Sequence, residues 1–307
     1  MQALTLTRGE FNEYLKRIGV EESDLKSVSK KEQLHLLQNR HCLRIPFENT
    51  QVLFSEEKIP ISVNLTDIFE KLITSNRGGY CFEQNSLFFA VLQTLGFQVE
   101  IKPARVIVNT TKPRQYNGLT HIILIVCDPD NPSEKWFADC GFGGYNPVAP
   151  LLLVENQKTT SAGIDYYFKK VETHTLATAS QTKVTWVLHT YQNDKIFYFM
   201  EFEEGSISFR NDIVLSNYYV CSHPDSFFTV CLYLSGFYKH DPNIRVNFWN
   251  LAKTERNVKE GTKSTKTIES FDEFYEILLA LDLQLTRDQA ERVFAKAKVG
   301  PPAPSRE

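Results

Sequence analysis

Three side chains in the first half of the sequence have the chemical types that acyl transfer through a thiol requires. Cys81 can act as the nucleophile, His121 as the base that accepts its proton, and Asp139 as the carboxylate that orients the imidazole. Each residue also has an ordinary structural interpretation, because cysteine is often buried, histidine can end a strand and aspartate often forms turns. The chemical interpretation therefore depends on a fold that brings the three together.

The residues around Cys81 predict that it begins a helix. It follows the Arg-Gly-Gly-Tyr sequence of residues 77–80 and opens an apolar stretch in which Leu87, Val91 and Leu95 recur at helical spacing. A thiolate at a helix N-terminus is stabilised by the helix dipole and by free backbone N–H groups. This setting suits a nucleophile.

His121 and Asp139 are both expected at the ends of strands. His121 precedes the β-rich run 122–126, and Asp139 follows the apolar residues 136–138. The glycine-rich segment 140–144 comes directly after Asp139. Because it lacks the spacing of known phosphate-binding loops, we interpret it as a tight turn.

The elements that must position these residues fall into three regions. Two capping boxes, Thr7 with Glu10 and Ser29 with Glu32, start predicted helices, and residues 65–73 form a third amphipathic stretch. The middle third predicts a series of strands, at 99–102, 104–108, 122–126, 184–187 and 196–202.

The last third of the sequence predicts a mixture of elements. Helices are expected at 271–281 and 286–297, the second with Thr286 as its N-cap. The charged run 253–266 is expected to be a solvated loop, and the proline-containing tail 299–307 is expected to be disordered.

Composition and charge argue against several classes of partner. The 307-residue chain has 34 Lys and Arg against 37 Asp and Glu, a net charge of −3 that gives no reason to expect nucleic acid as a partner. The longest apolar runs, such as 122–127 and 150–154, are far shorter than the roughly 20 residues that span a bilayer. We therefore expect no membrane helix.

The N-terminus and the cysteines favour a cytoplasmic location. Charged residues interrupt the first twenty positions, so no signal peptide is expected. The six cysteines form no C-x-x-C pair and no dense framework, so we expect neither a disulfide scaffold nor a metal site. Free thiols in a reducing compartment fit this pattern.

Five motifs follow one another along the chain in a fixed order. They are Ile45-Pro-Phe-Glu-Asn49, Arg77-Gly-Gly-Tyr-Cys-Phe-Glu-Gln-Asn85, Thr120-His-Ile-Ile-Leu124, Ala138-Asp-Cys-Gly-Phe-Gly143 and Asn217-Tyr-Tyr-Val-Cys-Ser-His-Pro-Asp-Ser226. In order and spacing they resemble the signatures of the arylamine N-acetyltransferases. The chain lacks the insertion of mammalian members and is more similar to bacterial and fungal ones.

This resemblance implies an α+β fold in three parts. A helical bundle (1–96) would carry the nucleophile, a central β-barrel (97–212) would carry the histidine and the aspartate, and an α/β lid (213–307) would end in a disordered tail. It also implies a catalytic triad of Cys81, His121 and Asp139, similar in geometry to those of papain-like proteases and transglutaminases.

The resemblance further implies a ping-pong reaction. An acetyl group would pass from acetyl-CoA to the cysteine and then to arylamines, arylhydrazines or N-hydroxyarylamines, as in xenobiotic metabolism. The coenzyme contacts that it implies are Asn117, Gly118, Gly143, Tyr219 and Ser226. The sequence departs from the mammalian pattern after Pro224, where it has Asp225-Ser-Phe and the mammalian enzymes have hydroxyl-rich residues.

The segment after Asp139 gives an expectation for the acyl donor. Phe142 is the only large side chain in the turn 141–144, and no Lys or Arg occurs between Asp139 and Leu153. An anionic malonyl group would lack a local cation to offset its desolvation. We therefore expect acetyl-CoA or propionyl-CoA in preference to malonyl-CoA.

Two alternative functions stay open at this point. A cysteine hydrolase or transglutaminase-like acyl transferase could use the same three residues on a peptide amide, and an inactive relative could bind aromatic ligands or a partner protein. Arg77, Glu48 and Asn85 also lie inside the motifs. We interpret them as a network that positions the Cys81 loop.

Overall fold

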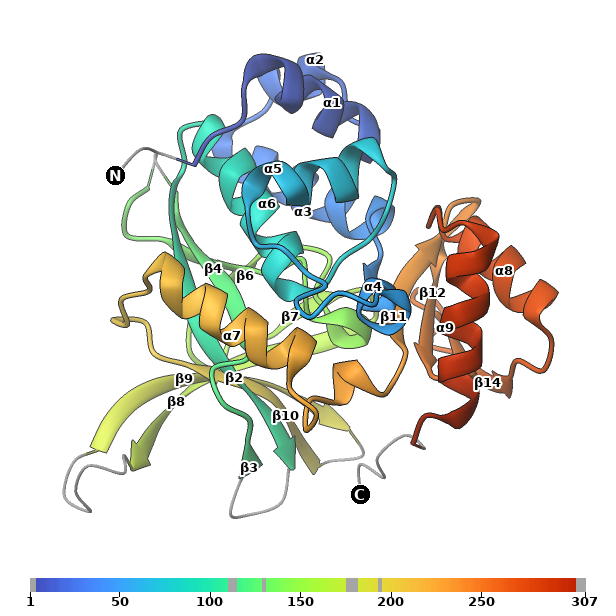
Figure 1. Cartoon of the computed structure of the whole chain (residues 1–307). Coiled ribbons are helices and arrows are strands. Elements are labelled where there is room, and N and C mark those ends of the chain that lie inside the picture. The colour runs from blue at the N-terminus through green and yellow to red at the C-terminus, as the bar shows by residue number, and fades with distance from the viewer. Residues whose placement is uncertain (1–3, 110–114, 129–130, 175–181, 193–194, 302–307) are drawn as a thin grey trace.

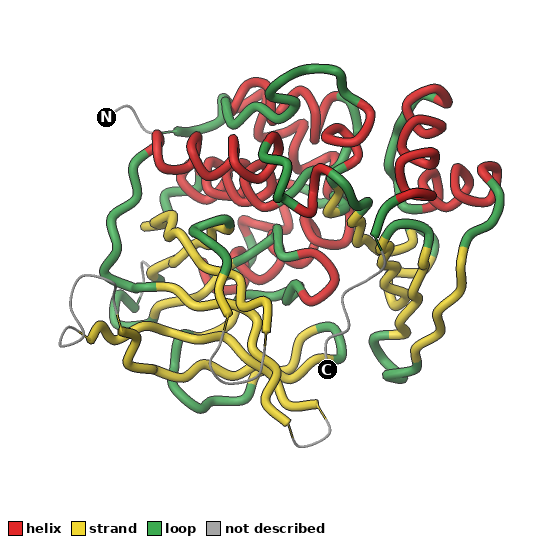
Figure 2. The backbone as a smooth tube through the Cα atoms, turned by 60° about the horizontal axis from the view of Figure 1, so that its bottom comes forward, coloured by secondary structure: helices red, strands yellow, loops and turns green. Residues whose placement is uncertain are grey.

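The computed structural model describes residues 4–109, 115–128, 131–174, 182–192 and 195–301. The helices of the N-terminal third lie above a curved β-sheet, and a smaller C-terminal unit of strands and helices lies beside both (Figure 1). Figure 2 shows the same separation, with the C-terminal helices apart from the N-terminal group. This architecture agrees with the α+β class that the sequence predicts.

The N-terminal region consists of helices grouped around the buried helix α6. They are α1 (Arg8–Ile18), α2 (Glu22–Lys26), α3 (Lys30–Arg44), α4 (Thr50–Phe54), α5 (Leu65–Phe69), the π-helical η1 (Glu70–Thr74) and α6 (Cys81–Thr94). Both predicted capping boxes are present, since the side chains of Thr7 and Ser29 accept hydrogen bonds from the N–H groups of Glu10 and Glu32.

Helix α6 packs against the sheet through a row of apolar side chains. Its Leu87, Phe88 and Val91 are fully buried in a cluster that includes Leu124 and Val126 of the neighbouring sheet. Burial of such side chains contributes about 1.5–3 kcal/mol each, so the helix that starts with Cys81 is fixed against the sheet.

The central sheet is antiparallel and strongly curved. Its strands are β2 (Gln98–Asn109), β3 (Gln115–Tyr116), β4 (His121–Cys127), β5 (Lys135–Ala138), β6 (Leu151–Leu152), β7 (Thr159–Ser161), β8 (Ile164–His174), β9 (Thr182–Gln192) and β10 (Lys195–Phe202). They pair in the order β6-β5-β4-β2-β10-β9-β8-β7, and β3 pairs with β2. An aromatic cluster that includes Phe137, Phe168 and Phe199 gathers side chains from strands across the sheet.

The C-terminal region forms a second sheet covered by two helices. Its elements are α7 (Arg210–Ser222), η3 (Phe227–Thr229), β11 (Tyr233–Tyr238), β12 (Asp241–Trp249), β13 (Ala252–Asn257), β14 (Lys263–Thr267), α8 (Phe271–Ala280) and α9 (Arg287–Val299). The sheet order is β1-β11-β12-β13-β14, and its edge strand β1 (Phe47–Glu48) comes from the N-terminal region. The expected boundary at residue 212 falls inside α7.

The charged run 253–266 is not the loop that the sequence suggests. It contributes β13 and β14, which pair antiparallel with Thr254 opposite Thr265. Charged side chains of the hairpin form ion pairs, such as Lys253 with Glu255. A high charge density therefore marks an edge hairpin here, because edge strands tolerate charged residues.

The described part of the expected disordered tail, residues 299–301, is ordered. Helix α9 extends to Val299, and the carbonyl oxygen of Pro301 accepts hydrogen bonds from Trp249 Nε1 (3.2 Å) and Asn250 Nδ2 (2.6 Å). The partners of Pro301 lie some fifty residues earlier in the chain, so local composition could not indicate them. Residues 302–307 lie outside the described residues.

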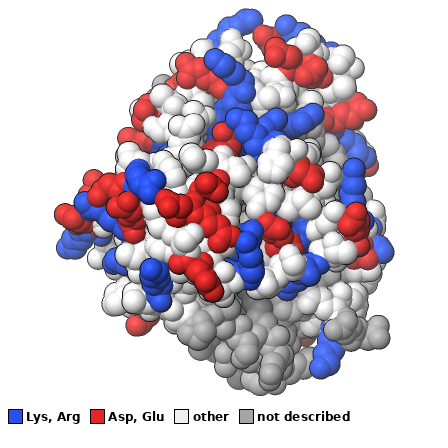
Figure 3. Space-filling model, turned by 90° about the vertical axis from the view of Figure 1, so that its right-hand side faces the viewer, with Lys and Arg blue, Asp and Glu red and all other residues white. Residues whose placement is uncertain are grey.

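Two observations bear on the expected partners, one on surface charge and one on membrane-spanning helices. On the side of the molecule that carries the C-terminal unit, acidic and basic side chains are interspersed (Figure 3). Among the described helices, none combines the length and the apolarity that a bilayer crossing needs.

The C-terminal core gives a test of this fold. Phe274 of α8 is fully buried against Phe248 and Phe294, whereas Leu279 of the same helix is 49% exposed. Phe274→Ala should lower the free energy of unfolding by about 3–5 kcal/mol, because it leaves a cavity in the core. The matched change Leu279→Ala should lower it by less than about 1 kcal/mol. Urea denaturation checks both, and equal effects would contradict the packing.

Candidate active site

Cys81 is the first residue of α6 and is 3% exposed. Backbone hydrogen bonds fix the loop before it, from Gly79 N to Pro46 O (3.2 Å) and from Glu48 N to Gly79 O (3.0 Å). A Cβ on Gly78 would lie 2.3 Å from the Pro46 carbonyl oxygen, so a side chain does not fit there. The paired glycines let the chain pass close to β1 before the helix starts.

His121 and Asp139 meet at one end of two paired strands. His121 is the first residue of β4, and Asp139 directly follows β5. The register pairs Leu124 with Ala138, which places the start of β4 beside the residues that follow β5. His121 is 2% exposed and Asp139 is 0% exposed. His121 Nε2 lies 2.7 Å from Asp139 Oδ2.

The charge state of His121 depends on its neighbours. Burial alone lowers the pKa of His121, but the Asp139 carboxylate outweighs burial and, with a contribution from a hydrogen bond to Cys81, raises it to about 10. With Nε2 bound to Asp139, the second ring nitrogen is available to the thiol. Cys81, His121 and Asp139 thus lie together, with His121 between the other two, which is the arrangement that the hypothesis of a catalytic triad requires.

The Asp139 carboxylate is also held by hydrogen bonds from two other elements. Its Oδ1 accepts from Asn85 Nδ2 (2.9 Å) and from Gly141 N (2.7 Å). The Asn85 amide, which comes from α6, also donates to Ile122 O (2.7 Å) and accepts from Cys140 N (2.8 Å). Asn85 therefore ties the nucleophile helix to both strands that carry the other two residues.

The polar residues that we expected in one network form two. Arg77 pairs with Glu48 (3.4 Å) and donates to Thr50 Oγ1 (3.1 Å), which braces the loop before α6. Asn85 instead bonds Asp139. The sequence motif indicates that all three matter but cannot show which of them share a contact.

Gly141 makes the closest approach between the turn and the nucleophile. A Cβ at Gly141 would lie 2.5 Å from Cys81 Cα. A Cβ atom does not come this close to another heavy atom in real structures. The close approach of the turn to α6 therefore requires glycine.

A cavity of about 450 Å³ reaches Cys81 and His121. Its walls are predominantly apolar, and the aromatic side chains among them come from all three regions of the chain: Phe47, Phe142, Tyr145, Tyr219, Phe227, Phe228, Tyr233 and Trp249. Such a cavity suits a flat aromatic ligand held by stacking and oriented by few polar groups. Across the described ranges, no cluster of three His, Cys, Asp or Glu side chains could hold a metal ion.

Three of the five residues predicted to contact the coenzyme line this cavity, and two do not. Asn117, Tyr219 and Ser226 are in its wall, whereas Gly118 and Gly143 are not. Gly143 instead packs on the Tyr233 ring, where a Cβ would lie 2.6 Å from Cε1, and its φ is +74°. Its role here is to form the turn.

The sequence motifs missed part of the cavity wall. Trp249 and Pro301 line it but lie beyond the last motif, at Asn217–Ser226. The only signal for Trp249 was its large aromatic side chain, and Pro301 stood in the segment expected to be disordered. The C-terminal region therefore contributes more to the site than the motifs indicate.

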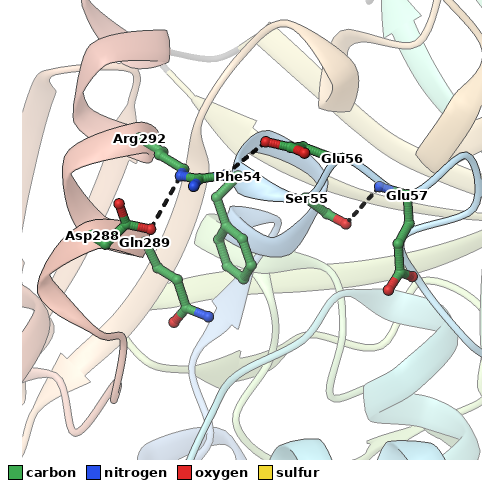
Figure 4. Close-up of a pocket in the computed structure, with 7 residues that line it drawn as sticks. All are labelled: Phe54, Ser55, Glu56, Glu57, Asp288, Gln289 and Arg292. Atoms are coloured by element: carbon green, nitrogen blue, oxygen red, sulfur yellow. Dashed lines mark hydrogen bonds and ion pairs between the residues drawn. The ribbon is translucent and has the colours of Figure 1, made fainter.

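A second hollow, between α4 and α9, has a different character. It is lined by neither Cys81 nor His121. Arg292 bridges Glu56 and Asp288 across it at 3.1 Å, and all three side chains are well exposed (Figure 4). Exposed ion pairs of this kind contribute little to stability, and the hollow has no group placed for catalysis.

Comparisons with known proteins agree with this geometry. A family model described as N-acetyltransferase matches residues 31–289. The arylamine N-acetyltransferase of Escherichia coli (strain K12) is 32% identical over 219 residues, which cover 71% of this chain and 69% of that protein. The chain belongs to the arylamine N-acetyltransferase family. It is therefore an acyltransferase, and the resemblance found in the sequence is confirmed.

Two other proteins are also similar to this chain. The structure of the arylamine N-acetyltransferase from Salmonella typhimurium matches with a TM-score of 0.78 at 26% identity, over 94% of this chain and 99% of that one, which confirms the predicted fold class. A protein of Gibberella moniliformis named N-malonyltransferase FDB2 is 25% identical over 282 residues, covering 83% of this chain and 79% of that protein.

The raised pKa of His121 predicts how stability depends on pH. The pKa is about 10 in the folded chain against an ordinary value of 6.5, so the His121–Asp139 pair stabilises the fold fully below pH 6.5 and loses its effect as the pH rises towards 10. The comparison is made in the Cys81→Ala background, so that the thiol does not contribute. There, Asp139→Asn should destabilise most at pH 6.5 and progressively less towards pH 10, as measured by urea denaturation. If Asp139→Asn lowered the free energy of unfolding by the same amount at every pH, the ion pair would be absent.

Proposed function

We propose that this chain transfers an acetyl group from acetyl-CoA to arylamines, arylhydrazines and N-hydroxyarylamines through an acyl-Cys81 intermediate. The observation that carries the proposal is the alignment of Cys81, His121 and Asp139 at an aromatic-lined cavity. Membership of the arylamine N-acetyltransferase family supports the donor and the acceptor class. A cytoplasmic location stays a prediction.

In the first half-reaction, Cys81 takes the acetyl group. His121 accepts the proton of the Cys81 thiol, and the thiolate attacks the carbonyl carbon of the thioester. The bond from that carbon to the sulfur of coenzyme A breaks, and the departing thiolate takes the proton from the imidazolium. Asp139 keeps its charge throughout and stabilises the imidazolium.

In the second half-reaction, an amine removes the acetyl group. The amine nitrogen attacks the acyl-cysteine carbonyl, His121 accepts the proton that the nitrogen loses, and Cys81 leaves as a thiolate. Aromatic amines are weak bases, so at neutral pH they are unprotonated and nucleophilic without further activation. The aromatic walls of the cavity favour such acceptors over aliphatic amines, which carry a charge that is costly to bury.

The intermediate provides a direct test of the nucleophile. Incubation with acetyl-CoA and no amine should add one acetyl group to the peptide that contains Cys81, detected by mass spectrometry. Cys231 lines the same cavity but has no described contact with His121, so it should stay unlabelled. Cys81→Ala should abolish turnover, whereas Cys127→Ala, on β4 outside the cavity, should not. Labelling of another cysteine would refute the assignment.

The charges around the cavity predict the donor preference. Among the described residues that line it, the charged side chains are His121 and Asp225, and neither Lys nor Arg is present. His121 is already paired with Asp139, so a malonyl carboxylate would be buried without a free cationic partner, and kcat/KM should be about tenfold or more lower with malonyl-CoA than with acetyl-CoA or propionyl-CoA. Steady-state kinetics with one fixed arylamine decides this. A preference for malonyl-CoA would show that a cation reaches the acyl group.

A further inference from the structure

Arg245 is a buried cation of the C-terminal sheet that binds the turn after β5, next to the active-site cavity. It lies on β12 and is 2% exposed. Its Nη1 donates to Gly144 O (3.1 Å) and its Nη2 to Asn146 O (2.8 Å). Neither the sequence motifs nor the proposed reaction assigns this residue a role.

No acidic side chain compensates Arg245 in the part of the chain that the structure describes. It forms no ion pair there, its Nε has no hydrogen-bond partner, and its guanidinium lies 4.7 Å from the centre of the Phe237 ring. Burial lowers the pKa of Arg245, and a buried charge without a counterion is unfavourable. The two carbonyls of the turn are therefore the main groups that satisfy this guanidinium.

The turn that Arg245 binds carries two cavity-lining aromatic side chains. Phe142 and Tyr145 both line the cavity, and the Phe142 ring lies 5.3 Å from the His121 ring. They alternate with the residues whose carbonyls Arg245 binds, Gly144 and Asn146. A movement of those carbonyls would therefore also move the part of the cavity wall that lies beside His121.

The C-terminal sheet contacts the same turn at two other points. The N–H of Gly144 donates to the Tyr233 hydroxyl (3.1 Å), and a Cβ on Gly144 would lie 2.6 Å from Asn247 Oδ1. Tyr233 and Asn247 lie on β11 and β12. The turn is thus fitted closely against this sheet, and Arg245 supplies a charged contact between the two.

We propose that Arg245 is a positioning residue that sets the size limit for the acyl group on Cys81. It acts through the carbonyls of Gly144 and Asn146, which hold Phe142 and Tyr145 against the acyl group, and it does not touch the substrate. The inference rests on the proposed function. When the guanidinium is removed, the turn relaxes and a longer acyl chain fits.

The test compares acyl-chain selectivity in three variants. Arg245→Met removes both hydrogen bonds to the turn. Arg245→Lys retains the charge and can keep one of these hydrogen bonds. Arg256→Met is the matched control. Arg256 lies directly opposite Arg245 on β13, and its described contacts include no hydrogen bond to the turn. The measurements are kcat/KM for acetyl-CoA and butyryl-CoA with one fixed arylamine, the thermal midpoint, and the rate of Cys81 alkylation by iodoacetamide.

The expected result is a change in selectivity with an intact nucleophile. Arg245→Met should raise the butyryl-to-acetyl ratio of kcat/KM by about tenfold, the lower end of the discrimination that one methylene group gives in a closed pocket. Arg245→Lys should raise it less, Arg256→Met should leave it unchanged, and the alkylation rate of Cys81 should stay within about twofold. A lower thermal midpoint with an unchanged ratio, or an equal change in Arg256→Met, would overturn the inference.

A second variant applies if Arg245→Met does not fold. Gly144→Ala places a methyl group against Asn247 Oδ1 and displaces the turn while Arg245 stays in place. It should raise the same ratio, and an unchanged ratio would again overturn the inference. If the wild-type protein transferred no acyl group from any of the donors, the proposed function itself would be overturned. If the wild type and the variants were all active and had the same butyryl-to-acetyl ratio, only the role of Arg245 would be overturned.

Discussion

The buried carboxylate of Asp139 is the group on which the rest of the site depends. It is fully removed from water, and an anion in that position is stable only when its oxygens are paired or hydrogen-bonded. One oxygen is bound by His121, and the other accepts from the amide of Asn85 and the backbone N–H of Gly141. These donors come from β4, from α6 and from the turn after β5. Satisfying one buried charge therefore fixes the nucleophile helix against the sheet.

The three regions of the chain each supply a separate part of the site. The N-terminal helices supply Cys81 at the start of α6, and the central sheet supplies the base and the carboxylate at the paired ends of its strands. The C-terminal sheet supports the turn that lines the cavity, and it receives its edge strand β1 from the N-terminal region. This exchange of elements makes the C-terminal region part of the cavity wall, so the term lid describes only part of its role.

The sequence predicts those features that depend on local patterns. Capping boxes and helical spacing predicted the helices that open with Thr7 and Ser29 and the helix that Cys81 begins, because their stabilising contacts lie within a few residues. The motifs also indicated the residues that now lie together in the site. The hairpin of β13 and β14, the anchoring of Pro301 and the brace at Arg245 were missed. Each depends on partners far away in sequence, which neither composition nor periodicity reveals.

The most direct test of this account is the single-turnover acylation of Cys81 by acetyl-CoA in Asp139→Asn. The asparagine keeps the size of the side chain but removes the charge that orients His121 and stabilises the imidazolium formed when it accepts the proton of Cys81. The account predicts a folded protein whose acylation is slower by a factor on the order of 10⁴, the effect known for loss of the aspartate in a comparable triad. Acylation at nearly the wild-type rate, in a variant with a native circular dichroism spectrum, would contradict the central role of this carboxylate.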